Sequence, residues 1–201
     1  MSTVDLQAAD APGWDVLRAG LEEAQAALGG RLVAAYALGS LAHGGFAVAV
    51  SDVDQALIID RLDAVGPIVE RVRERVVTRL KTPLAARLSI FWSSWEALRA
   101  DREGGRFPLV DRLDLVQSGV LLLGTDRRGE VALPSGAAER RRLVAEAAEF
   151  MLERLARGPG APLPLDVVRT QVFDCRQVTK AVLFPVRFIY TAEVGGFATN
   201  Q

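Results

Sequence analysis

The stretch ALGSLAHGGFAVAVSDVDQALIID, residues 37–60, places two acidic residues in a nearly apolar context. Asp52 and Asp54 stand on either side of Val53, and Val, Leu and Ile are frequent in the residues that follow. This composition predicts a buried β-strand over 52–59. Because the side chains of a strand alternate between its two faces, we expect both carboxylates on the same face, with their Cα atoms roughly 7 Å apart.

Two carboxylates at this spacing indicate a cation site. They repel each other unless a positive charge lies between them, and their oxygens suit Mg²⁺, which takes one or two protein carboxylates together with phosphate and water oxygens. A pair of such ions can bind both the attacking and the leaving oxygen in phosphoryl or nucleotidyl transfer. Asp52 and Asp54 are therefore predicted to be metal ligands and catalytic residues. The alternative is a surface turn, for which Ser51-Asp52 is ordinary chemistry.

A Gly-Ser pair precedes the acids. Gly39 and Ser40 follow a predicted buried strand over 31–38. A glycine at a strand-to-helix turn lets backbone amides approach a phosphate, and the start of a helix favours negative charge. Ser40 adds a hydroxyl donor and stands where a helix N-cap is expected. The segment is therefore predicted to combine a phosphate-binding turn with a metal-binding pair.

This arrangement resembles the nucleotidyltransferase superfamily related to DNA polymerase β. The superfamily's signature is an apolar residue, Gly-Gly or Gly-Ser, a spacer, and then Asp-x-Asp on a strand; here these are residues 38–40, 41–50 and 52–54. The resemblance is closest to bacterial antibiotic adenylyltransferases of the aminoglycoside type and their uncharacterised relatives, which add a C-terminal helical domain. LDLVQSGVLLLGTD, residues 113–126, and TKAVLFPVRFIYTAEVGG, residues 179–196, resemble further segments of such proteins.

The resemblance implies an enzyme that moves a nucleoside monophosphate from a nucleoside triphosphate to a hydroxyl of a small molecule or a macromolecule. It implies two Mg²⁺ ions and a triphosphate substrate, with ATP as the first candidate. Gly39, Ser40, Ser51 and Lys180 are the nucleotide-binding residues that it indicates. Lys180 is included because basic residues of the helical domain reach the nucleotide phosphates in relatives. The acceptor is not identified.

One position departs from the superfamily's pattern. Its enzymes generally carry a third acid on the next core strand, as a metal ligand or as a general base. That strand is predicted over 84–92, and the matching position falls on Ser89, or alternatively on Arg87 or Phe91. None of these is a carboxylate, and a serine does not take up a proton near neutral pH as a carboxylate does.

Three interpretations of the missing acid stay open. Another acid, such as Glu96 or one in the C-terminal helices, could serve instead. The acceptor could need little help from a base, since positioning and metal electrostatics dominate phosphoryl-type transfer. Or the protein is a catalytically impaired nucleotide-binding or interaction protein. An antitoxin-type nucleotidyltransferase that acts with a helical toxin partner is a further variant, made less favourable by the helices that this chain itself carries.

The remaining pattern predicts an α/β (α+β) fold in two parts. A small mixed-sheet nucleotidyltransferase domain flanked by helices is expected over 1–130, and a C-terminal helical bundle over 137–201. Helices of the first domain are predicted at 13–28, 62–81, 94–99 and 109–117, and its last strand at 119–124. In the second domain, helices at 136–157 and 166–194 flank a Pro- and Gly-rich linker over 158–165.

Composition limits the class of partner. The 201 residues are 50% hydrophobic, and 24 Lys and Arg against 25 Asp and Glu leave a net charge of −1. This charge provides no basic face for long nucleic acid, and no uncharged apolar run reaches the roughly 20 residues of a membrane span. With no basic-then-apolar N-terminal segment and a single cysteine, a cytoplasmic protein is expected. A second copy of the chain could complete the helical bundle as a homodimer.

Overall fold

The structure is a computed structural model, and it describes residues 6–102, 104–133, 136–137, 140–146, 148–149 and 175–196. Contacts between Cα atoms divide the chain into two compact units, with the boundary after Leu133. The first unit contains the sheet. The second contains helical residues 140–146 and α8 (Cys175–Val194). The predicted linker over 158–165 and the first part of the helix predicted at 166–194 lie outside the described residues.

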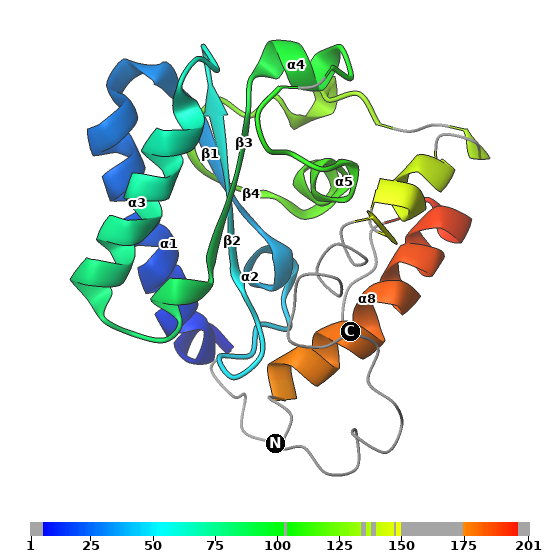
Figure 1. Cartoon of the computed structure of the whole chain (residues 1–201), viewed down its shortest axis with the longest axis horizontal. Helices are drawn as coiled ribbons and strands as arrows, with labels where there is room; N and C mark the ends of the chain where they lie inside the picture. The colour runs from blue at the N-terminus through cyan, green and yellow to red at the C-terminus, as the bar shows by residue number, and fades with distance from the viewer. Residues whose placement is uncertain are drawn as a thin grey trace. The chain divides into compact units, whose positions relative to one another are not determined.

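Four strands form one mixed sheet in the order β3-β2-β1-β4 (Figure 1). β1 (Leu32–Leu38) pairs antiparallel with β2 (Val53–Ile59) and with β4 (Val120–Gly124), and β2 pairs in parallel with β3 (Leu88–Ser93). The predicted α/β fold with a small mixed sheet is thereby confirmed. β3 begins later than predicted because Ala85–Arg87 forms a short 3₁₀ turn, η2, ahead of it.

Helices cover both faces of the sheet. α1 (Leu6–Leu28) and α3 (Val65–Leu80) pack on one face, and α4 (Trp95–Arg99) and α5 (Leu109–Ser118) lie over the other (Figure 1). The two faces draw on alternate residues of the same strands. In β2, Leu57 and Ile59 belong to the cluster under α1 and α3, whereas Ala56 and Ile58 belong to the cluster under α4 and α5.

The first residues of α4 and α1 can be compared with the helix starts predicted from the sequence. Ser94 caps α4 as predicted, and its hydroxyl accepts a hydrogen bond from the Ala97 amide at 3.2 Å. The predicted start of the first helix at residue 13 is wrong, because α1 begins at Leu6 and includes Pro12. A proline removes one backbone donor, and the buried apolar side chains that follow it, such as Leu17, keep the helix packed on the sheet.

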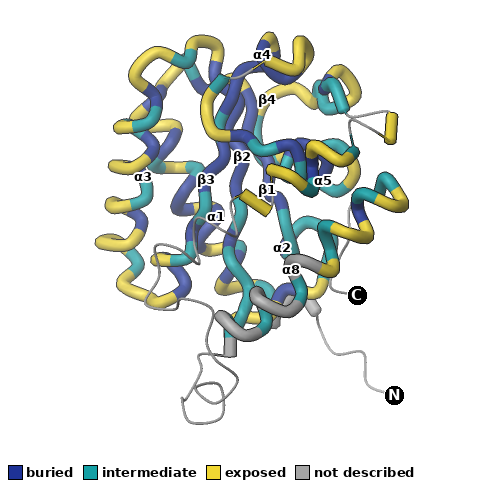
Figure 2. Tube along the Cα trace, turned by 45° about the vertical axis from the view of Figure 1, so that its right-hand side comes forward, coloured by how far each residue is buried: buried dark blue, intermediate teal, exposed yellow. Residues whose placement is uncertain are grey.

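Buried residues concentrate in the strands and on the helix sides that face them (Figure 2). Every residue from Ala34 to Leu38 of β1 is at most 1% exposed, and so is every residue from Val53 to Ile59 of β2 apart from Asp54. A single partly buried acid in an otherwise closed strand marks the place where the sheet opens to solvent. Among the described residues, no helix is both long enough and apolar enough to cross a membrane.

Candidate active site

The acidic pair lies where the end of β1 meets the start of β2. Asp54 pairs with Leu38 of β1 and with Ser89 of β3. Val53 is fully buried in the cluster under α1 and α3, so Asp54 faces the opposite side of the sheet, under α5. Asp52 immediately precedes β2 and is also partly buried. Continued alternation assigns it to the same side as Asp54.

Gly39 brings the Gly-Ser turn into direct contact with Asp54. Its backbone has a φ of +63°, and a Cβ atom placed on it would come within 2.4 Å of Asp54 Oδ2. A side chain at this position would strain the left-handed backbone and displace the Asp54 carboxylate, so the turn favours glycine. The predicted N-cap role of Ser40 is wrong: α2 (Gly39–His43) already begins at Gly39, so Ser40 stands inside its first turn, and the Leu38 cap position makes no side-chain cap bond.

Asp114 of α5 is the residue that sequence reasoning missed. Its Oδ2 accepts a hydrogen bond from the Gly39 amide at 2.7 Å, and the residue is only 2% exposed. A signal was present in the sequence, because Asp114 stands between the buried Leu113 and Leu115. An acid enclosed by apolar neighbours on a helix needs a polar partner elsewhere in the fold.

The loop between the two halves of the motif is closed on itself and tied to the sheet. Ser51 donates its amide to the Ala47 carbonyl at 2.8 Å, and its hydroxyl accepts from the Ala47 amide at 3.0 Å. The Arg87 guanidinium donates to the carbonyls of Ser51 at 2.9 Å and of Val48 at 2.6 Å. The Ser51 hydroxyl therefore helps to close the loop that precedes Asp52. Its role toward nucleotide stays a prediction.

The structure locates the three positions, Ser89, Arg87 and Phe91, at which the third acid of the superfamily is expected. Ser89 stands directly beside Asp54 in the parallel ladder. Arg87 precedes β3, and the Phe91 ring packs on Phe107 with centroids 5.8 Å apart. Glu96 lies on α4, beyond the strand, and is ion-paired with Arg102.

The donor set of this site fits magnesium. Asp52 and Asp54 supply carboxylate oxygens, and Mg²⁺ ordinarily takes its remaining ligands from phosphate and water. Within the part of the chain that the structure describes, no group of three His, Cys, Asp or Glu side chains is placed to hold one ion. A cation here would therefore depend on substrate oxygens to complete its coordination.

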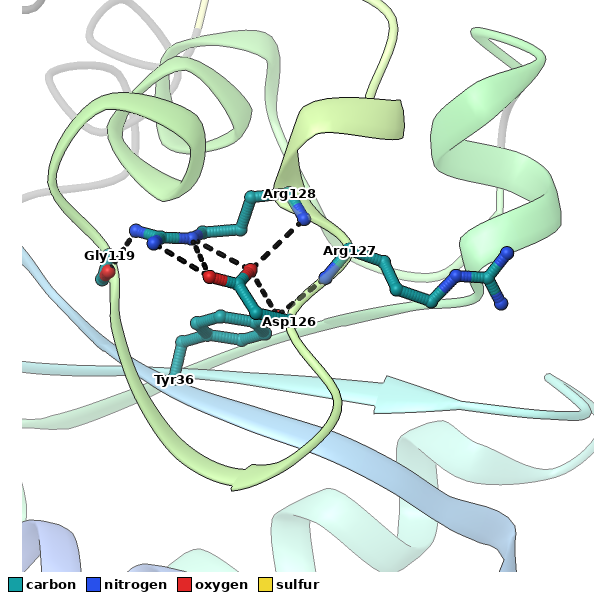
Figure 3. Close-up of polar contacts among 5 residues, drawn as sticks. All are labelled: Tyr36, Gly119, Asp126, Arg127 and Arg128. Carbon is teal, nitrogen blue, oxygen red and sulfur yellow. Dashed lines mark hydrogen bonds and ion pairs between the residues drawn. The ribbon is translucent and has the colours of Figure 1, made fainter.

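A polar network under the same face fixes the chain that leaves β4 (Figure 3). Arg128 donates to both carboxylate oxygens of Asp126 and to the Gly119 carbonyl, and the Tyr36 hydroxyl donates to Asp126 Oδ1 at 3.1 Å. The Arg128 guanidinium lowers the pKa of Asp126 to about 2, and burial raises the pKa of Tyr36 to about 12. Tyr36 is fully buried, whereas the Asp126 and Arg128 side chains are partly exposed, so the network ties the chain after β4 to the interior of the sheet.

A hollow of about 510 Å³ adjoins the Gly-Ser turn. It is lined by Asp10, Ala11, Trp14, Asp15, Arg18 and Leu41. Leu41 belongs to α2, and the other residues belong to α1. The hollow therefore borders the motif without containing Ser40 or the acidic pair.

Comparison with known proteins places the fold. No protein-family model and no curated protein matches the sequence. Among solved structures, the fold is similar to that of an adenyltransferase. The spectinomycin adenyltransferase AAD(9) from Enterococcus faecialis, solved with ATP and spectinomycin, matches with a TM-score of 0.64 at 11% identity, over 92% of this chain and 78% of that chain.

Two toxin-antitoxin structures are more distant. A doubly substituted mutant of the toxin-antitoxin MntA-HpeT matches with a TM-score of 0.37 at 14% identity, over 72% of this chain and 91% of that chain. A toxin-antitoxin structure with AMP-PNP matches with a TM-score of 0.36 at 16% identity, over 75% of this chain and 97% of that chain. TM-scores this low do not establish a shared fold. The similarity to AAD(9) confirms the fold that the motif's resemblance implied.

Lys180 lies in α8, in the second unit. Its side chain lies outside the described part of the structure. Its role toward nucleotide phosphates therefore stays a prediction.

Proposed function

We propose that this chain is a magnesium-dependent nucleotidyltransferase, which moves a nucleoside monophosphate from a triphosphate, with ATP as the first candidate, to a hydroxyl of a small molecule or macromolecule. The observation that carries the proposal is the contact of Gly39 with Asp54, because it brings a phosphate-binding turn against a metal-binding carboxylate. The fold similarity to AAD(9), solved with ATP and spectinomycin, supports a nucleotide donor.

In this reaction the acceptor oxygen attacks the α-phosphorus, and the bond from that phosphorus to the oxygen bridging to the β-phosphate breaks. Pyrophosphate leaves, and the acceptor proton passes to solvent or to a base. Asp52 and Asp54 would hold Mg²⁺, which neutralises the phosphate charge and stabilises the attacking and leaving oxygens. Ser40 would donate its hydroxyl to a phosphate oxygen. Gly39 would contribute by having no side chain, which leaves room for the Asp54 carboxylate beside the turn. Its amide already donates to Asp114.

A nucleotide-binding protein without turnover is the second candidate. It is favoured by Ser89, which stands beside Asp54 at the position where the superfamily's third acid is expected. A serine cannot act there as a general base near neutral pH.

The first experiment measures triphosphate binding and pyrophosphate release by the full chain, with Mg²⁺ and with EDTA. Asp54→Asn and Asp52→Asn are each expected to lower Mg²⁺-dependent binding or turnover more than about 100-fold, since the loss of a ligand exceeds the loss of an outer partner. Their melting temperatures are measured alongside, so that a loss of ligation is distinguished from a loss of folding. A wild type that binds no triphosphate with Mg²⁺ would contradict the proposal.

Ser89→Glu separates the two candidates, with Ser89→Gln as the matched control for size. For an enzyme that already has its proton acceptor, pyrophosphate release should not rise in either variant. A rise of more than about tenfold in the Glu variant alone would support the nucleotide-binding protein that has lost its base. This threshold is set below the roughly 100-fold or more that a general base usually contributes.

A further inference from the structure

Gly39 is held from two directions by acids of different elements. On its Cα side it packs against Asp54 of β2, and on its amide side it donates to Asp114 of α5 at 2.7 Å. The first contact joins the two halves of the motif, the Gly-Ser turn and the Asp-x-Asp strand. The second contact comes from α5, which is separated from the motif in the chain by α3, η2, β3 and α4.

α5 is itself anchored, so the position of Asp114 is set by the fold. Arg112, on the same helix, is 8% exposed and donates Nε to the Phe107 carbonyl and Nη1 to Asp101, both at 2.9 Å. At the other end of the helix, the Gly119 carbonyl accepts from Arg128, which Asp126 orients (Figure 3). A carboxylate carried by a helix fixed at both ends can define where the Gly39 amide lies.

The turn needs such a restraint. Glycine has more backbone conformations available than any other residue, and Gly39 adopts a left-handed one. A charge-assisted hydrogen bond is roughly twice as strong as a neutral one. Because a misplacement of about 1 Å at a reacting centre can cost about 100-fold in rate, a restraint on this turn bears on chemistry as well as on stability.

Resting on the proposed function, we propose that Asp114 is a positioning residue for nucleotidyl transfer. Its carboxylate holds the Gly39 amide, keeps the turn closed against Asp54, and so directs Ser40, and not the Gly39 amide, to the phosphates. At 2% exposure Asp114 does not itself reach substrate. It acts through Gly39.

The test uses the full chain and the magnesium complex of α,β-methylene-ATP, whose α–β linkage cannot be cleaved. Asp114→Ala is expected to weaken binding of this complex about tenfold or more, in the range found for loss of an outer-shell partner. Asp114→Asn keeps an acceptor oxygen and should restore the affinity to within about threefold of wild type, as expected for a neutral bond replacing a charged one. Ser94→Ala is the matched control, because it removes a buried hydrogen bond of α4 under the same face of the sheet without touching the anchors of α5 or Gly39.

A second readout does not depend on nucleotide. The Gly39 amide proton should resonate downfield in wild type and move upfield in Asp114→Ala but not in Ser94→Ala. Equal affinities of wild type and Asp114→Ala, an equal loss in Ser94→Ala, or an unmoved Gly39 resonance would each overturn the positioning role. A wild type that does not bind the complex would instead overturn the proposed function, and the Gly39 resonance would still decide whether Asp114 holds the turn.

Discussion

The two faces of the sheet are built by different interactions. Under α1 and α3, the strands present Val, Leu and Ile side chains to helices of matching periodicity, and the buried face is apolar apart from Gln55, which donates to the Leu17 carbonyl at 3.3 Å. Under α4 and α5, a smaller apolar cluster is combined with Tyr36, Arg112 and Asp114, which are buried and hydrogen-bonded. The comparison teaches that both faces supply stability through apolar burial, and that the second face also sets the geometry of the candidate site.

Neighbouring residues of β2 allow the sharpest test of this difference. Leu57 and Ile58 are both fully buried, but they face opposite sides of the sheet. Leu57→Ala and Ile58→Ala should each lower the free energy of unfolding by about 2–5 kcal/mol through lost contacts and a cavity. In urea titrations the losses should be similar, whereas affinity for Mg²⁺-nucleotide should fall only for Ile58→Ala. Equal losses of affinity would remove the distinction between the faces.

Gly39→Ala tests the contact that carries the proposed function. The left-handed backbone of Gly39 makes a Cβ unfavourable by about 1–2 kcal/mol, and the methyl group would meet Asp54 Oδ2. We therefore expect a fall in melting temperature together with a loss of nucleotide affinity. Gly30→Ala is the control, because a Cβ placed there meets nothing within 4 Å. If Gly39→Ala binds nucleotide as wild type does, the turn does not contribute to the site.

Tyr36→Phe probes the polar network with the smallest expected effect. At neutral pH the loss of the hydroxyl's hydrogen bonds should cost about 1 kcal/mol. Because burial raises the pKa of Tyr36 to about 12, the folded state keeps a proton that the unfolded chain releases above about pH 10. The stability of wild type should therefore be intact below about pH 10 and decline as the pH rises from about 10 to about 12. Urea titrations at about pH 8 and about pH 11 measure this fall in the free energy of unfolding. The fall should be smaller in Tyr36→Phe, which lacks the titrating hydroxyl.

The parts predicted from sequence were those that local pattern determines. Alternation and helical spacing located β1, β2 and α3 to within a few residues, and the Gly-Ser and Asp-x-Asp halves of the motif predicted the fold. The start of α1 was missed because a proline inside a helix is tolerated when the following face is well packed. The contacts of Asp114 and Arg87 were missed because each joins residues far apart in the chain. No periodicity encodes such contacts.

The outer margin of β3 is already occupied by the chain's own backbone. Trp92 exchanges both main-chain hydrogen bonds with Arg106, at 2.9 Å each, and the Ile90 carbonyl accepts from the Arg106 side chain. A polypeptide acceptor therefore could not add itself as a further strand beside Ser89 without displacing this segment. If the proposed transfer uses a protein acceptor, its hydroxyl would approach over the face of the sheet that carries Asp54, and not along the edge of β3.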